Sequence, residues 1–203
     1  MPFPPSPPPA APAADATGGH GGPRLLCPVV LVGMMGAGKT AVGAELSRRL
    51  GVAFLDSDAQ IERAANATIA EIFARDGEAF FRARETEVIA RLMAAGPAVI
   101  STGGGAFLSE VNRATIAASG VSVWLKADLE ILWNRVRHKT TRPLLRTADP
   151  RATLAGLLAQ REPLYGLAQV IVEAEPDLSI EGMALKVIEA LRARGGVLAA
   201  EGE

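Results

Sequence analysis

An apolar strand that runs directly into a glycine-rich loop and a helix constrains this fold most strongly. Residues 28–33 read PVVLVG, a continuous apolar run typical of a strand buried on both faces. The loop from Gly33 to Thr40 reads GMMGAGKT, which has the G-x-x-x-x-G-K-T spacing of a P-loop. Such a loop directs several backbone N–H groups and a helix N-terminus at phosphate groups. We therefore expect Lys39 to bridge the β- and γ-phosphates of a nucleotide and Thr40 to bind Mg²⁺.

Strand and helix signals alternate over the rest of the chain. Helices are expected up to Leu50, over 59–95, after the caps Ser109 and Asp128, and over 153–160 and 180–193. The alternation predicts an α/β fold of the P-loop NTPase type, a three-layer α/β/α arrangement around a five-stranded parallel sheet. Ligands of such sheets gather at the carboxyl ends of the strands. The five expected strands are 28–33, 52–55, 98–101, 121–125 and 170–172.

The composition divides the chain into three parts. Residues 1–23 consist largely of proline, alanine and glycine, which predicts a disordered tail. Residues 24–196 carry the strand and helix signals of one domain, and residues 197–203 are expected to form a flexible C-terminus. Within the domain, the polar and proline-broken segment near 138–150 is the expected mobile lid.

Charge and cysteine content narrow the class of function. The formal net charge is −1, without the basic excess that is typical of nucleic-acid binders. The single cysteine excludes an internal disulfide, which suits a reducing compartment. No run is apolar and long enough for a membrane span, and the N-terminus lacks the pattern of a secretory signal. We expect a cytoplasmic protein that binds neither nucleic acid nor membrane.

Two further groups of residues follow expected strands and should lie at the same sheet edge as the P-loop. Asp56 and Asp58 close the second strand, and alternation along a strand would point both carboxylates to one side. They could bind a metal, orient a hydroxyl or accept its proton, or they could simply cap a turn or helix. Residues 103–105 are three glycines, which permit close approach of a ligand to the backbone or form a flexible loop.

Three arginines lie in motifs that suit the capture of an anion. Arg82 lies in FFRARE, Arg142 in TRPLL and Arg161 in REPLY. A guanidinium binds a carboxylate or phosphate in a planar, bidentate manner, although a solvated surface position is the ordinary alternative for any one arginine. That surface role is the expectation for Arg84, Arg91 and Arg113.

The order of these motifs resembles the shikimate kinase family of P-loop kinases. The motifs run G-x-x-G-x-G-K-T, L-D-x-D-x-x-I-E, F-R-x-x-E, G-G-G, R-P-L-L and R-x-P-L-Y. The resemblance covers about Pro28 to Ala193. It implies transfer of the γ-phosphoryl group of ATP to the 3-hydroxyl of shikimate, with Mg²⁺ as cofactor and with a monomeric protein.

The resemblance also implies a role for each matching residue on the acceptor side. Asp58 would hold the ring hydroxyls of shikimate and could accept the proton of the attacking one. Arg82, oriented by Glu85, would bind the carboxylate together with Arg161. Backbone contacts would come from Gly104 and Gly105.

On the nucleotide side, the resemblance implies that Arg142 swings in on the lid and neutralises charge on the transferring group. Arg135 would flank the adenine, and Asp56 would lie near Mg²⁺ through water. Lys39 and Thr40 keep the roles derived above. The phosphates would contact Gly36, Ala37, Gly38, Lys39, Thr40 and Ala41.

Two alternatives remain at this stage. A P-loop kinase for another small polyol acid, such as a gluconokinase, would share the P-loop and the lid, but the F-R-x-x-E and R-x-P-L-Y motifs argue against it. A catalytically inactive protein that only binds ligand would be expected to lose Lys39, Asp58 or Arg142, and all three are present.

Overall fold

The described part of the chain folds around one five-stranded parallel sheet. The computed structural model describes residues 23–138 and 143–199. The strands are β1 (Val29–Val32), β2 (Phe54–Asp56), β3 (Val99–Ser101), β4 (Val121–Lys126) and β5 (Val170–Glu173). They lie in the order β2-β3-β1-β4-β5, and every neighbouring pair is parallel. The predicted α/β class and parallel sheet are therefore confirmed.

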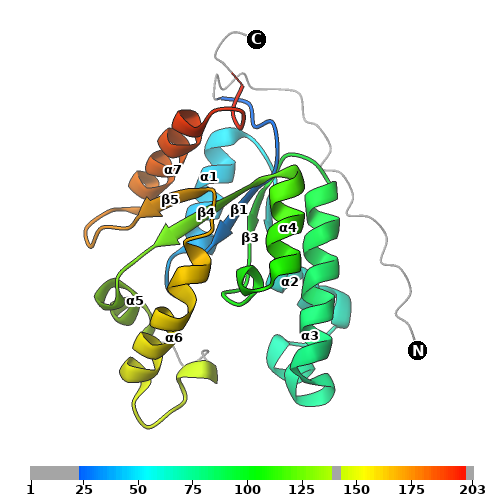
Figure 1. Ribbon diagram of the computed structural model, residues 1–203, viewed down its shortest axis with the longest axis vertical. Coiled ribbons are helices and arrows are strands. Elements are labelled where there is room, and N and C mark those ends of the chain that lie inside the picture. The colour runs from blue at the N-terminus through cyan, green and yellow to red at the C-terminus, as the bar shows by residue number, and fades with distance from the viewer. Residues whose placement is uncertain (1–22, 139–142, 200–203) are drawn as a thin grey trace.

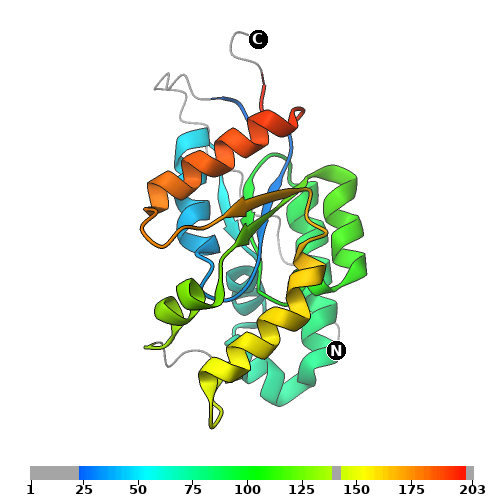
Figure 2. The same ribbon diagram turned by 60° about the vertical axis from the view of Figure 1, so that its left-hand side comes forward.

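Helices cover both faces of this sheet, as Figures 1 and 2 show. Helices α1 (Lys39–Leu50) and α7 (Ile180–Arg194) pack together on one face, and α3 (Ile69–Ala94) and α4 (Glu110–Ser119) pack together on the other. Ser109 and Asp128 cap α4 and α5 (Leu129–Val136) as predicted. No helix within the described ranges has both the length and the apolar character of a membrane span.

The central strand β1 explains why a run of β-branched residues precedes the P-loop. All four of its residues are buried, because helices pack on both faces and β3 and β4 flank it. Such a strand has no solvent-facing side and therefore reads as continuously apolar. The loop that follows it leaves the sheet at the centre of the carboxyl edge.

The long helical region predicted over 59–95 is two helices, and the second is kinked. Helix α2 (Ser57–Ala65) ends at Asn66, which has a positive φ of 46°. Thr68 then starts α3 with a capping box, because its side chain accepts from the N–H of Glu71 while Glu71 reaches back. Inside α3, Gly77 has a φ of 82° and a ψ of 170°, which interrupts the helix.

Helix α6 (Pro150–Tyr165) is longer than the predicted 153–160 at both ends. It begins at Pro150, where the missing N–H costs nothing, and the Asp149 side chain caps it. It continues through Pro163, which forgoes one helical hydrogen bond, to the fully buried Tyr165. The predicted lid segment contains a 3₁₀ turn at Pro143–Leu145, and its residues 139–142 lie outside the described residues.

The two ends of the described chain lie side by side (Figure 1). Leu25 and Leu198 form an antiparallel bridge, and the N–H of Leu26 donates to the carbonyl of Val197 at 2.8 Å. Val197 is fully buried, so residues 197–199 pack on the domain although the sequence placed them in the flexible C-terminus. Residues 1–22 of the predicted tail lie outside the described residues.

Replacing Gly77 with alanine tests the kink in α3. The φ and ψ of Gly77 lie in a region that only glycine adopts readily, so Gly77→Ala should lower the free energy of unfolding by about 1–3 kcal/mol. The control is Gly156→Ala in α6, where a Cβ would meet no atom within 4 Å and alanine favours the helix by up to about 1 kcal/mol. Urea unfolding measures both variants, and equal stability of the two would contradict the kinked backbone.

Candidate active site

A cavity of about 450 Å³ lies at the carboxyl ends of the strands. Residues 35–42 of the P-loop and α1 line one wall, and residues 101–104 after β3 line another, with Asp56 and Asp58 between them. Arg135 of α5 and six residues between 174 and 183 complete it. Sequence positions that are far apart thus meet at one edge of the sheet, as predicted for an α/β protein.

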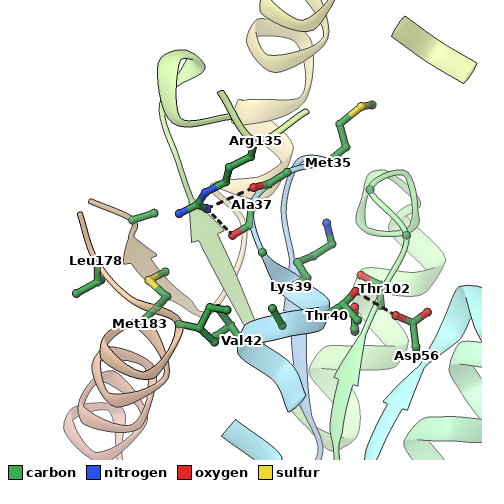
Figure 3. A pocket seen from close by; sticks show the side chains of 18 of the residues that line it. Met35, Ala37, Lys39, Thr40, Val42, Asp56, Thr102, Arg135, Leu178 and Met183 are labelled. Carbon is green, nitrogen blue, oxygen red and sulfur yellow. Dashed lines mark hydrogen bonds between the residues drawn. The ribbon is translucent and has the colours of Figure 1, made fainter. Parts of the chain in front are cut away.

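Lys39 occupies the middle of this cavity (Figure 3). Its Nζ donates to the carbonyls of Gly33 at 2.8 Å and Met34 at 3.0 Å, so the ammonium group lies over the mouth of the loop. Helix α1 begins at Lys39, and its first N–H groups have no helical partner by the geometry of any α-helix. A positive side chain and a helix N-terminus therefore converge where phosphates would bind.

Thr40 and Asp56 lie on the side of Lys39 opposite to Leu178 and Met183 (Figure 3). Thr40 Oγ1 donates to Asp56 Oδ2 at 3.4 Å. Mg²⁺ commonly takes one or two protein oxygens and completes its shell with water and substrate phosphate, so this pair fits the ion. Within the described residues, no group of three or more His, Cys, Asp or Glu side chains could hold a metal by itself.

The reasoning from strand alternation that placed Asp56 and Asp58 on one side was wrong. Strand β2 ends at Asp56, and Asp58 lies in the first turn of α2. Asp56 Oδ1 accepts from the N–H groups of Asp58 and Ala59 at 3.0 and 3.2 Å, so Asp56 is also a helix cap. The two carboxylates still reach the same cavity, because the cap turns the chain back toward the P-loop.

Asp58 has the most strongly perturbed carboxylate of the cavity. Burial is the main cause that raises its pKa to about 6, and the negative charges of Asp56 and Glu85 add to it while Lys39 opposes it. Its Oδ1 is buried and accepts no hydrogen bond from the described residues. An orphaned acceptor beside a cavity is suited to a hydroxyl group of a ligand.

Two of the three glycines after β3 pack directly against Asp58 and Arg82. A Cβ at Gly103 would lie 2.7 Å from Asp58 Oδ1, and a Cβ at Gly105 would lie 2.6 Å from both terminal nitrogens of Arg82. Any side chain at these positions would displace the groups that line the site. The glycines therefore serve close packing of the site, in addition to any contact with a ligand.

Arg82 is held by a buried partner. Its Nη1 donates to Glu85 Oε2 at 2.8 Å, and Glu85 is only 1% exposed. Burial raises the pKa of Glu85, and the Arg82 guanidinium opposes that effect. The pair fixes the Arg82 guanidinium beside Gly105, and Glu78 accepts weaker bonds from its Nε and Nη2, each at 3.3 Å. A guanidinium has more N–H groups than these bonds use, and 37% of the Arg82 side chain is exposed, so its terminal nitrogens can still donate to an anion.

Arg161 lies on α6, four residues before Tyr165. Burial raises the pKa of the Tyr165 hydroxyl, and the positive charge of Arg161 opposes that effect. The Tyr165 hydroxyl donates to the carbonyl of Gly104. Arg161 therefore belongs to the helix that contacts the glycine loop, although it does not line the cavity itself.

Arg135 contacts the P-loop. Its Nη1 donates to the carbonyls of Gly36 at 3.3 Å and Ala37 at 3.4 Å, which Figure 3 shows as dashed lines. It lies on the same side of the cavity as Leu178 and Met183. These apolar side chains could cover one face of a nucleotide base beside the guanidinium.

The residues between 174 and 183 that line the cavity were not predicted from the sequence as part of the site. Ala174, Leu178 and Met183 follow the carboxyl end of β5 and line the cavity. Their position after an expected strand was the available signal, but they lack charged or glycine-rich motifs. Arg142, predicted for the lid, lies outside the described residues.

Arg113 does not have the surface role expected for it. Its Nη1 donates to the carbonyls of Phe107 at 2.9 Å and Leu108 at 2.8 Å, in the 3₁₀ turn that follows the three glycines. Asn112 adds a bond from Nδ2 to the carbonyl of Ala106 at 2.9 Å. Two side chains of α4 therefore hold the 3₁₀ turn that directly follows the glycine loop.

A P-loop opposite an orphaned carboxylate and an anchored arginine, on a parallel α/β sheet, defines the class of P-loop kinases that act on small molecules. The chain belongs to the shikimate kinase family. The family model described as shikimate kinase matches residues 35–192. A shikimate kinase of Ruegeria pomeroyi is 66% identical over 170 residues, which cover 84% of this chain and 87% of the relative. One of Cereibacter sphaeroides is 62% identical over 175 residues, which cover 86% and 87%.

Solved structures agree with this assignment. A shikimate kinase of Acinetobacter baumannii in complex with shikimate superposes with a TM-score of 0.77 at 40% identity, over 81% of this chain and 92% of that chain. A gluconokinase of Sinorhizobium meliloti gives a TM-score of 0.51 at 20% identity, over 82% and 95%, and shares the fold alone. The protein is therefore a kinase that uses ATP.

The raised pKa of Asp58 predicts a pH-dependent gain in stability for Asp58→Asn. Well below pH 3.8 the carboxyl is neutral in both states. As the pH rises from 3.8 to about 6 the unfolded state ionises while the folded state keeps its proton, so stability is lost over this window and the loss is complete above it. At pH 7.5 the ligand-free variant should be more stable by up to about 3 kcal/mol, and the gain should shrink toward zero near pH 4.

Urea unfolding between pH 4 and 8 measures this gain. The matched control is Asp149→Asn at the cap of α6, because asparagine caps a helix about as well as aspartate does. A gain for Asp58→Asn that does not change with pH would show that ionisation of Asp58 is not its cause.

Proposed function

We propose that the protein transfers the γ-phosphoryl group of ATP to the 3-hydroxyl of shikimate and releases shikimate 3-phosphate and ADP. This is a step of the shikimate pathway toward chorismate and the aromatic amino acids. The observation that carries the proposal is one cavity that holds both the P-loop lysine and the orphaned Asp58 carboxylate, in a chain of this family. The A. baumannii neighbour with bound shikimate supports the choice of acceptor.

In this proposal, the acceptor lies between a carboxylate and two arginines. Shikimate has hydroxyl groups on one part of its ring and a carboxylate on another. Asp58 accepts a hydrogen bond from the ring hydroxyls, while Arg82 and Arg161 bind the carboxylate. Gly104 and Gly105 contribute backbone contacts, since Gly104 lines the cavity beside the P-loop and Gly105 adjoins Arg82. This set of charges matches an anion that carries hydroxyl groups.

Asp58 is also proposed to accept the proton of the attacking hydroxyl. A general base works best when its pKa lies close to the working pH. With a pKa of about 6, Asp58 is mostly ionised at neutral pH, and it is more basic than an ordinary aspartate. Its position in the same cavity as Lys39 places it to act on a hydroxyl beside the phosphate site.

On the nucleotide side, the phosphates are proposed to contact the backbone of residues 36–41 and Lys39, with Arg135 beside the base. Thr40 and Asp56 would hold Mg²⁺, Asp56 through water, and the ion would supply positive charge to the β- and γ-phosphates when bound. Arg142 is proposed to close over the phosphates with the lid, which would exclude water as a competing acceptor.

We also propose that the protein acts as a monomer in the cytoplasm. Every group assigned to the site belongs to one copy of the chain. The single cysteine suits a reducing compartment, and the near-zero net charge favours a small-molecule substrate over nucleic acid or a membrane surface.

The substrate is tested by the release of ADP with ATP and Mg²⁺ over a panel of small hydroxylated acids. We expect turnover with shikimate, because Arg82 and Arg161 face its carboxylate while Asp58 faces its hydroxyls. Gluconate is the critical comparison, since a gluconokinase shares this fold. Turnover with gluconate and none with shikimate would overturn the proposal.

Asp58→Asn separates acceptor chemistry from nucleotide binding. We expect kcat to fall at least about a hundredfold, because the amide neither accepts the proton nor carries the charge. The Kd for ATP, measured by calorimetry, should change less than about threefold, because Asp58 lies across the cavity from the base-binding side chains. A comparable loss of ATP affinity would place Asp58 on the nucleotide side instead.

A further inference from the structure

The hydroxyl of Tyr165 lies between the glycine loop and the P-loop. Tyr165 is the only tyrosine of the 203 residues, and it is fully buried in the last turn of α6. Its hydroxyl donates to the carbonyl of Gly104 and lies 3.7 Å from Met34 Sδ in the P-loop. One oxygen atom thus contacts both loops of the site.

The bond to Gly104 determines how the glycine loop is oriented. Glycine peptides rotate easily, so a loop of three glycines needs external contacts to hold one conformation. Asn112 and Arg113 hold the carbonyls that follow the loop, at Ala106 to Leu108, and Tyr165 holds the carbonyl within it. The carbonyl of Gly104 and the N–H of Gly105 belong to one planar peptide unit. Fixing the carbonyl therefore also fixes the direction of the N–H of Gly105.

Arg161 of the proposed carboxylate clamp belongs to the same face of α6 as Tyr165. The two residues are four positions apart, so their side chains are neighbours on the helix surface. Burial raises the pKa of the Tyr165 hydroxyl, and the positive charge of Arg161 opposes that effect. The hydroxyl that donates to Gly104 therefore lies on the side of α6 that carries the proposed clamp.

Packing alone does not account for a tyrosine at this position. The ring lies 6.0 Å from the ring of Trp124, a contact that phenylalanine would make equally well. A hydroxyl in a fully buried position is costly unless it is hydrogen-bonded, and this one donates to the Gly104 carbonyl of the proposed acceptor site.

We infer that Tyr165 is a positioning residue, which orients the Gly104 peptide and so sets the affinity for the acceptor rather than for the nucleotide. The inference rests on the proposed function, since the acceptor-binding role of Gly104 belongs to it. Tyr165 does not line the cavity, so it acts through this peptide without touching the substrate.

Tyr165→Phe tests this role, because it keeps the ring and removes only the hydroxyl. We expect the KM for shikimate to rise about tenfold, since the part-buried Gly104 carbonyl loses its donor. The KM for ATP should stay within about twofold of wild type, because the P-loop keeps the bonds from Lys39 and Arg135.

The control variant is Leu154→Val, which trims a fully buried side chain of α6 about 16 Å from Tyr165 along the helix. It should lower Tm while leaving both KM values near wild type. If Tyr165→Phe leaves the KM for shikimate unchanged, or raises both KM values equally, the inference is overturned. Absence of wild-type turnover with shikimate would instead overturn the proposed function, so the two failures are distinguishable.

A measurement on the wild-type protein covers the case in which the variant does not fold. Tyrosine labelled with ¹³C at Cζ gives one resonance, because the chain has one tyrosine. We expect saturating shikimate to shift this resonance, since the Gly104 peptide that the hydroxyl contacts is proposed to bind the acceptor. A resonance that does not move in saturating shikimate overturns the inference.

Discussion

The parallel pairing of β1 with β3 is the constraint on which the rest of the site depends. Leu31 is in register with Ser101, and Thr102 donates from both its backbone N–H and its hydroxyl to the Leu31 carbonyl, at 3.3 and 3.1 Å. Two strands that end at the same level must release their loops side by side. A Cβ at Gly104 would accordingly lie 3.6 Å from the Gly33 carbonyl. The phosphate loop and the acceptor loop are neighbours because of this register.

Charge is distributed unevenly within the cavity that these loops enclose. Lys39 and the N-terminus of α1 make one side positive, while Asp56 and Asp58 make the adjoining side negative. The negative groups raise the pKa of Asp58, and burial does so even more. The burial of Asp58 therefore lowers the stability of the fold at neutral pH. It also makes this carboxylate basic enough to act on a hydroxyl, as is common at functional sites.

Helices α5 and α6 add groups from outside the sheet. Arg135 on α5 bonds to the P-loop carbonyls, and Tyr165 on α6 bonds to Gly104. Both helices lie beyond the carboxyl ends of the strands in Figure 1. Arg135 of α5 lines the cavity, whereas Tyr165 of α6 acts on it only through the glycine loop.

The sequence by itself determined the fold class, the P-loop and the set of candidate residues. Alternating strand and helix signals are local properties, and motif spacing in G-x-x-x-x-G-K-T reflects a local backbone shape. The helix caps at Ser109 and Asp128 could also be predicted from the sequence, because capping is a local property. The capping box of Thr68 and Glu71 carries a similar signal, although it was not used to divide the region 59–95.

Only the tertiary structure decided how the candidates are arranged. Asp58 reaches the cavity from the first turn of a helix rather than from a strand, since Asp56 caps that helix. The bond from Tyr165 to Gly104 and the apolar wall near Leu178 and Met183 join residues that are distant in the chain. Such contacts depend on strand order and register, and these result from the packing of the whole core rather than from any local pattern.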